Sequence, residues 1–255
     1  MRFIRRRLWR LVAVGTVATA GLLVAADIVM LQVFEARAAT GIARSTAGER
    51  AWVDLGGSPF LPSYLRGRLG SVEVEALGMS GSGLRVDRFD LQMSDVIFKR
   101  GRALALVRSR HATRMRIDGK ELIGRFEIVE RDLFDFIRPR VGGVAALRIT
   151  EAGVEVSFEG VEEGTPPTRY LPRMVDGPGG GGRRVLALRL VGEAGIPPAH
   201  LHAARLIEGV VDLPPAPEGL QFDVRLGNGV FAVEFAGTEA YMWIGSGRPD
   251  PEEDQ

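Results

Sequence analysis

The segment Val72–Met93, VEVEALGMSGSGLRVDRFDLQM, decides the fold class because apolar and charged residues alternate along it. A period of two is typical of β-strands that bury one face, and the glycines at 81 and 83 mark a turn between two such strands. The apolar positions change from even to odd numbers, so we expect a β-bulge near Asp87 and Arg88. The even positions are Val72, Val74, Leu84 and Val86, and the odd ones are Phe89, Leu91 and Met93.

Short apolar runs separated by glycine and proline continue on both sides of this segment. We predict a strand at 52–55, one or two strands at 104–117, a turn at Gly119-Lys120 and a strand at 122–129. In the second half we predict strands at 145–150, 154–158 and 184–191, and a hairpin of 221–226 with 230–235 across Gly227-Asn228-Gly229. Helical spacing predicts helices at 27–47 and 130–137. The pattern suggests an α+β protein in which a curved antiparallel sheet covers a helix or encloses an apolar groove. An ordinary filled core is the alternative, and from the pattern alone it is the more frequent outcome.

The N-terminus combines five arginines within its first ten residues with an uncharged run, Leu11–Ala26. Arginines remain on the cytoplasmic side while such a run inserts, so the rest of the chain is expected outside the inner membrane. The run measures only about 24 Å, short of a bilayer core of roughly 30 Å, but 28–33 can extend it past Asp27. We favour a single-pass anchor over a signal peptide cleaved near Ala36-Arg37-Ala38, which would release a secreted or periplasmic protein. The organisation expected is an anchor segment at 1–31, one domain at 32–246 and an acidic, disordered tail at 247–255.

Composition excludes several classes of function. The chain has no cysteine, which removes disulfides, thiol nucleophiles and cysteine metal sites. The net charge is +1, and because five positive charges lie in the first ten residues, the remainder carries −4. That balance argues against a nucleic-acid partner.

The sequence contains few candidate catalytic or metal-binding motifs. His200 and His202 lack the spacing of a zinc-protease helix, and the glycine run at 177–182 lacks the ending of a phosphate-binding loop. No nucleophile elbow occurs, and the paired acids at 162–163 lie in polar turn sequence. We therefore predict no catalytic residues, no metal and no cofactor, and an envelope hydrolase is the least favoured function.

A basic segment between Asp95 and Asp118 contains no acid. If it is a strand, its arginines share one face and offer a weak candidate site for anionic headgroups. Cross-strand pairing with Glu73, Glu75, Asp87 or Asp90 is the favoured alternative. The four arginines are Arg108, Arg110, Arg114 and Arg116.

Several blocks of sequence resemble the LmeA-like family of actinobacterial phospholipid-binding proteins, over about residues 20–240. The most specific are Ser58-Pro59-Phe60-Leu61 and Leu65-Arg66-Gly67-Arg68-Leu69; others are Val72-Glu73-Val74, Arg131-Asp132-Leu133, Ile149–Val154 and Leu213–Leu220. The resemblance implies an extracytoplasmic domain, similar to half of a tubular, BPI-like lipid-binding domain, that binds phospholipid acyl chains during envelope biogenesis. The glycine run at 177–182 and the arginine-rich segment depart from the family pattern.

An acyl-chain site has no sequence motif, because each buried methylene contributes about 0.8 kcal/mol without any polar contact. The resemblance, which the absence of a motif does not oppose, makes a lipid carrier or sensor at the inner membrane the favoured function. A structural or interaction protein of the envelope, with unknown protein partners, is the alternative. Candidate contacts near an opening are Phe60, Leu61, Tyr64 and Leu65, and candidate wall residues are Val72, Val74, Leu84, Val86, Phe89 and Leu91.

Overall fold

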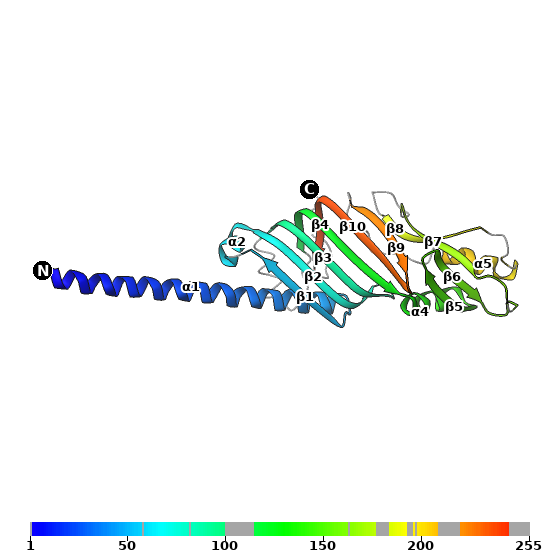
Figure 1. Ribbon diagram of the computed structural model, residues 1–255, viewed down its shortest axis with the longest axis horizontal. Helices are drawn as coiled ribbons and strands as arrows, with labels where there is room; N and C mark the ends of the chain where they lie inside the picture. The colour runs from blue at the N-terminus through cyan, green and yellow to red at the C-terminus, as the bar shows by residue number, and fades with distance from the viewer. Residues whose placement is uncertain are drawn as a thin grey trace.

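A long N-terminal helix and two antiparallel sheets make up this α+β protein (Figure 1). The computed structural model describes residues 2–57, 59–81, 83–99, 115–162, 164–176, 184–192, 196, 198–208 and 220–244. The helices are α1 (Arg2–Ser45), α2 (Phe60–Arg66), α4 (Glu130–Val141) and α5 (Pro198–Ile207). The strands are β1 (Arg50–Gly56), β2 (Arg68–Gly81), β3 (Leu84–Phe98), β4 (Met115–Val129), β5 (Val144–Thr150), β6 (Gly153–Phe158), β7 (Thr168–Asp176), β8 (Arg184–Leu190), β9 (Gln221–Gly227) and β10 (Val230–Ile244).

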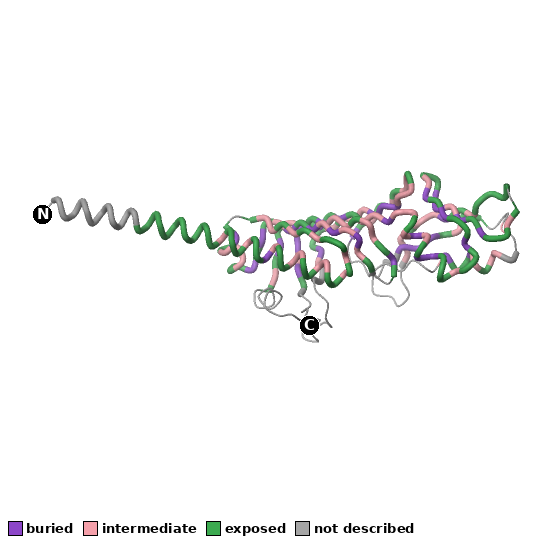
Figure 2. The backbone as a smooth tube through the Cα atoms, turned by 90° about the horizontal axis from the view of Figure 1, so that it is seen from below, coloured by how far each residue is buried: buried purple, intermediate pink, exposed green. Residues whose placement is uncertain are grey.

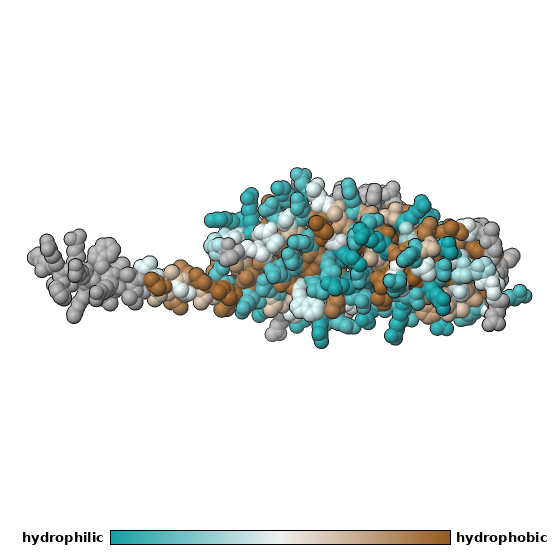
Figure 3. All heavy atoms as spheres, in the orientation of Figure 1, coloured by the Kyte–Doolittle hydropathy of each residue, from teal (hydrophilic) through white to brown (hydrophobic). Residues whose placement is uncertain are grey.

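Helix α1 has two halves with different surroundings. Its first half projects away from the domain, and Figure 3 shows mostly apolar surface on the coloured part of the projecting helix, next to the domain. The second half packs along β1, and its end is fastened where the Ser80 N–H donates to the Thr46 carbonyl over 2.7 Å. Among the described residues, Gly15–Ser45 is long and apolar enough to cross a membrane, a test that signal sequences also pass. The helix predicted to continue from the membrane and dock on the domain is present.

The larger sheet has the strand order β1-β2-β3-β4-β10-β9, with every neighbouring pair antiparallel. The predicted hairpin is confirmed as β9 and β10, and its turn places Asn228 and Gly229 at φ values of 49° and 77°. Such positive φ values favour asparagine and glycine, which explains why this turn could be read from the sequence.

The smaller sheet has the order β5-β6-β7-β8. The strands therefore form two sheets, whereas the sequence pattern predicted one curved sheet. Helix α4 separates β4 of the first sheet from β5 of the second. Tyr170, fully buried in this half, donates its hydroxyl to the Ala204 carbonyl of α5 over 3.2 Å. Burial raises the pKa of Tyr170, so the hydroxyl stays protonated and remains a donor.

The bulge expected near Asp87 and Arg88 is wrong. Strands β2 and β3 keep one register from the pair Arg68–Ile97 to the pair Gly81–Leu84. The apolar phase changes because β3 passes between two cores. Leu84 and Val86 pack with α4, whereas Phe89, Leu91 and Met93 pack in the cluster nearer α1.

The turn expected at Gly119-Lys120 is also wrong, because β4 runs without interruption through both residues. Gly119 pairs with Ala240 of β10, and a β-carbon at this glycine would overlap the Met93 side chain. The glycine therefore permits close packing of a neighbouring strand's side chain, which is the other common reason for glycine within a strand.

Two hydrophobic clusters hold the fold, and Figure 2 shows buried positions along both sheets. The cluster that we call the proximal cluster lies between α1, α2 and the larger sheet, and includes Phe34, Phe60, Val72, Val74, Leu91, Met93 and Leu122. The cluster that we call the distal cluster joins the larger sheet to α4, α5 and the smaller sheet, and includes Leu84, Ile128, Leu133, Ile137, Tyr170 and Phe231.

Candidate functional site

The apolar face of the larger sheet is continuous across all six strands. One row of the register crosses the sheet with no polar side chain in it. Because side chains alternate along each strand, these residues share one face and their neighbours in sequence share the other. The row is Val53, Val74, Leu91, Gly124, Phe235 and Phe222.

Phe235 lies at the centre of a group of aromatic rings on this face. Its ring centroid is 6.4 Å from that of Phe89, 6.4 Å from that of Phe126 and 6.1 Å from that of Phe222. A β-carbon on Gly124 would overlap the Phe235 ring, so the glycine on β4 provides the space that this ring occupies.

The four phenylalanines (Phe89, Phe126, Phe222 and Phe235), which we call the aromatic patch, are only partly buried. Phe222 packs against both hydrophobic clusters, so apolar surface runs without a break from one cluster to the other. Helix α1 packs mainly on the edge strand β1 of the larger sheet. Helix α4 packs on β3 and β4 of that sheet and on β5 of the smaller one. The aromatic patch lies between these helices and retains accessible apolar surface.

At the end of the sheet nearest the projecting helix, α2 is fixed to α1 by a charged cap. Both carboxylate oxygens of Asp27 accept backbone N–H groups of α2, from Phe60 over 2.8 Å and from Leu61 over 2.5 Å. The first turn of a helix has N–H groups without partners inside the helix, and a carboxylate is a favourable acceptor for them. Residue 27 in α1 therefore determines where α2 lies.

Aromatic packing reinforces this attachment. Phe34 of α1 lies 5.4 Å from Phe60 and 4.9 Å from Tyr64 between ring centroids, and Tyr64 lies 5.7 Å from Phe98 of β3. One step further along α1, Glu35 accepts the Leu55 N–H of β1 over 3.1 Å. The second half of α1 is thus part of the folded domain.

Replacing Asp27 with alanine should loosen α2 without unfolding the sheets. Loss of a capping acceptor costs about 0.5–2 kcal/mol, so we expect roughly ten-fold faster hydrogen exchange at the amides of Phe60 and Leu61. Hydrogen–deuterium exchange mass spectrometry measures this. Asp27→Asn, which keeps one carbonyl acceptor, should lie between wild type and Asp27→Ala; equal exchange in all three proteins would contradict the capping role.

The residues predicted to contact lipid divide between the two clusters. Phe60 is 1% exposed and therefore a core residue, whereas Leu65 on the same helix is 60% exposed. Both residues belong to α2, Phe60–Arg66, for which no helix was predicted. The proximal cluster includes or contacts most of the predicted residues: Val72, Val74, Phe89, Leu91 and Tyr64. The distal cluster includes or contacts Leu84 and Val86. Leu61 is partly buried at the start of α2.

Of the predicted headgroup residues, Arg108, Arg110 and Arg114 lie outside the described residues. Arg116 contacts Asp118 of its own strand over 2.8 Å, and its guanidinium lies 4.3 Å from the Tyr241 ring centroid.

Because Arg116 already has an acidic and an aromatic partner, we expect Arg116→Gln to change the affinity for anionic phospholipid less than two-fold. Equilibrium binding to vesicles with and without phosphatidylglycerol measures this effect. A loss of ten-fold or more, confined to the anionic vesicles, would show that this arginine contacts the headgroup.

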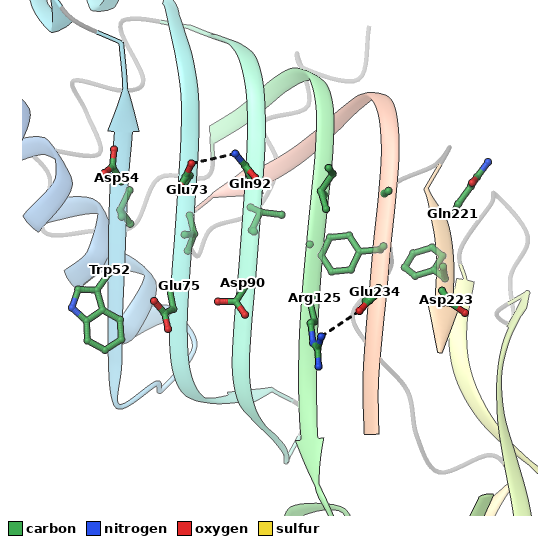
Figure 4. A pocket seen from close by; sticks show the side chains of 18 of the residues that line it. Trp52, Asp54, Glu73, Glu75, Asp90, Gln92, Arg125, Gln221, Asp223 and Glu234 are labelled. Carbon is green, nitrogen blue, oxygen red and sulfur yellow. Dashed lines mark hydrogen bonds and ion pairs between the residues drawn. The ribbon is translucent and has the colours of Figure 1, made fainter. Parts of the chain in front are cut away.

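An open cavity of about 930 Å³ crosses the opposite, polar face of the larger sheet. Figure 4 shows two rows of mainly polar side chains standing across the strands, one containing Asp54, Glu73, Gln92 and Gln221, the other Trp52, Glu75, Asp90, Arg125, Glu234 and Asp223. The hydrophobic row of the register lies between them, and its residues, including Phe222 and Phe235 of the aromatic patch, also line the cavity. A charged groove of this kind does not suit a hydrocarbon chain, because burying charged groups beneath it is costly.

Six carboxylates and two arginines line the polar groove, so negative charge is in excess and only part of it is paired. Arg125 and Arg225 contact Glu234 at 3.3 and 2.9 Å, and Arg88 contacts Glu75 at 3.1 Å. The hydrogen bond from Arg88 to Asp90 raises the pKa of this arginine, which stays charged. Exposed pairs contribute at most about 1 kcal/mol each, so they organise the polar face more than they stabilise it.

The histidines and carboxylates of the domain form no metal-binding cluster of three or more side chains among the described residues. His200 stacks on Phe158 with ring centroids 5.1 Å apart, and His111 lies outside the described residues.

Sequence reasoning missed two features of the site: the cap made by Asp27 and the part of the aromatic patch on β4, β9 and β10. The patch had a usable signal, since the apolar residues at 222, 224 and 226 alternate with polar residues. Those at 231, 233 and 235 alternate with Ala232 and Glu234 on the second strand of the predicted hairpin. The partner of Asp27 is 33 residues away in sequence and had no such signal.

Comparison with known proteins agrees with the resemblance seen in the sequence. The family model described as LmeA-like phospholipid-binding matches residues 25–228, which is most of the chain. No curated protein and no solved structure matches it.

Proposed function

The chain belongs to the LmeA-like phospholipid-binding family, and from this membership we propose that it is a membrane-anchored, extracytoplasmic phospholipid-binding protein that carries or senses lipid during envelope biogenesis. The acyl chains of the bound phospholipid lie on the apolar face of the larger sheet, over the aromatic patch. In this proposal the sheet serves as one wall of an architecture similar to half of a tubular lipid-binding domain.

The observation that carries the proposal is the partial exposure of the aromatic patch in the middle of an otherwise buried face. Large aromatic side chains gain about 1.5–3 kcal/mol each when they are fully buried, so a face that leaves four of them partly exposed retains capacity for an apolar ligand. The strands β2, β3, β4 and β10 have 14 or 15 residues each, long enough for an extended acyl chain to lie along them.

The contacts of α1 support a retained anchor over a cleaved signal peptide. Cleavage after Ala38 would remove Asp27, Phe34 and Glu35, all of which bind the folded domain. The family match begins at residue 25 and so includes this docked half. Five arginines before the apolar run favour a cytoplasmic N-terminus and a domain outside the cell membrane.

Native mass spectrometry of the full chain, extracted in a mild detergent, tests the proposal. We expect a population that retains about one phospholipid mass after detergent removal, under conditions that strip lipid from a single-helix control peptide of residues 1–45. Repeated recovery of bare protein only would contradict lipid binding by the domain.

A further inference from the structure

The membrane-proximal end of the domain carries an exposed surface whose chemistry differs from the rest of the sheet. We infer that α2 and the adjoining ends of β2 and β3 lie in the outer headgroup layer of the membrane that α1 crosses. The surface, which we call the α2 surface, consists of Leu65, Arg66, Arg68, Ile97 and Lys99. The inference rests on the proposed function in one respect, that α1 spans the membrane.

The length of α1 sets the depth of α2. Leu11–Ala26 would span about 24 Å, which is short of a bilayer core of roughly 30 Å, whereas Leu11–Val33 would span about 34 Å. The side chains that extend the apolar helix are themselves exposed: Ile28 by 50%, Val29 by 57% and Val33 by 41%. A helix that covers the bilayer core therefore reaches the level of residues 28–33.

Helix α2 lies at that same level. Its N-terminus is bonded to Asp27, and its Phe60 and Tyr64 pack on Phe34, so it lies beside residues 27–34 of α1. Figure 1 shows α2 at the end of the domain that faces the projecting part of α1. An element fixed beside the last turns of a spanning helix must contact the headgroup layer.

The residues that α2 and its neighbours expose suit that layer. Leu65 is 60% exposed and Ile97 is 48% exposed, and Arg68 pairs directly opposite Ile97 in the sheet. None of the ion pairs among the described residues involves Arg66, Arg68 or Lys99, although most other arginines of the larger sheet are paired with acids. Apolar side chains rimmed by cations without acidic partners are the features that bind an anionic membrane interface.

The absence of cysteine allows a clean test with single labels. The full chain is reconstituted into vesicles of 70% phosphatidylcholine and 30% phosphatidylglycerol, with one environment-sensitive fluorophore at Leu65→Cys, Val24→Cys or Ser157→Cys. Ser157 is exposed on β6, in the smaller sheet, and provides the control far from the membrane. Quenching by lipids with a nitroxide at a shallow or a deep acyl position is then measured.

We expect the label at 65 to be quenched at least two-fold more than the label at 157, most strongly by the shallow nitroxide, and the label at 24 most strongly by the deep one. Quenching at 24 with none at 65 would overturn the inference and leave the anchor intact; no quenching at either position would overturn both. The variant Arg66→Gln/Arg68→Gln/Lys99→Gln should halve the quenching at 65, and unchanged quenching would show that these cations do not hold α2 to the lipid.

Discussion

Replacing Phe235 with asparagine is expected to weaken phospholipid binding by roughly ten-fold or more. Phe235 lies at the centre of the aromatic patch and contacts Phe89, Phe126 and Phe222, so its loss removes apolar surface that we assign to the acyl chain. Loss of about 1.5 kcal/mol of contact corresponds to roughly a factor of ten in affinity. Equilibrium titration with a fluorescent phospholipid in detergent-solubilised full chain measures the effect.

The neighbouring residue provides a matched control. Ala236 is exposed on the polar face of the same strand, so Ala236→Asn places the same amide one residue away with no predicted effect on affinity. Phe235→Leu, which keeps apolar bulk, should stay within about three-fold of wild type. If Phe235→Asn fails to fold, the titration is repeated with Phe222→Asn, on the edge strand β9. Wild-type affinity in a folded variant would exclude the aromatic patch as the binding surface.

Replacing Phe60 with alanine is expected to lower the stability of the domain by about 3–5 kcal/mol. The side chain is 1% exposed and packs against Phe34 and Tyr64, so truncation leaves a cavity between α1, α2 and the sheet. For a domain of this size the change corresponds to a decrease of roughly 6–20 °C in the unfolding midpoint. Thermal unfolding of the full chain in nanodiscs, followed by circular dichroism in the β-sheet region, measures it.

Ile123→Ala is the control for this second prediction, because Ile123 lies on β4, away from the α2 surface, and is 57% exposed. Its midpoint should change by less than about 2 °C, since exposed substitutions usually cost no more than about 0.5 kcal/mol. Similar losses in the two variants would mean that Phe60 is not the buried residue that joins α2 to the domain. A lipid-contact role for Phe60 would instead lower affinity with little change in the midpoint.

The class of fold could be predicted from local patterns, but the division into two sheets could not. Alternation at Val72–Met93 and the Gly227–Gly229 turn depend on neighbouring residues, and both appear in the structure as antiparallel strands. The register that places Phe235 beside Phe89 and Phe126 depends on pairing between strands more than 100 residues apart. A single sequence contains no direct signal for such pairing.

The errors have one physical cause: the same residue type or pattern can serve different structural purposes. Gly119 was predicted as a turn because glycine permits unusual φ values, but its function is to admit the Met93 side chain. The change of phase at Phe89 was predicted as a bulge, but β3 contacts different cores on either side of it. Phe60 was predicted to contact lipid near an opening, but it is covered by α1, where it packs on Phe34, 26 residues earlier in the sequence.

In this account the acyl chain lies on the apolar face of the larger sheet. The most direct test is photo-crosslinking with a phospholipid that carries a diazirine near the end of one acyl chain. After irradiation of the full chain and proteolysis, mass spectrometry should locate the crosslinks on the apolar face of β3, β4, β9 and β10, chiefly at Phe89, Phe126, Phe222 and Phe235. Crosslinks confined to α1, or distributed over the polar groove around Glu73 and Asp90, would contradict it.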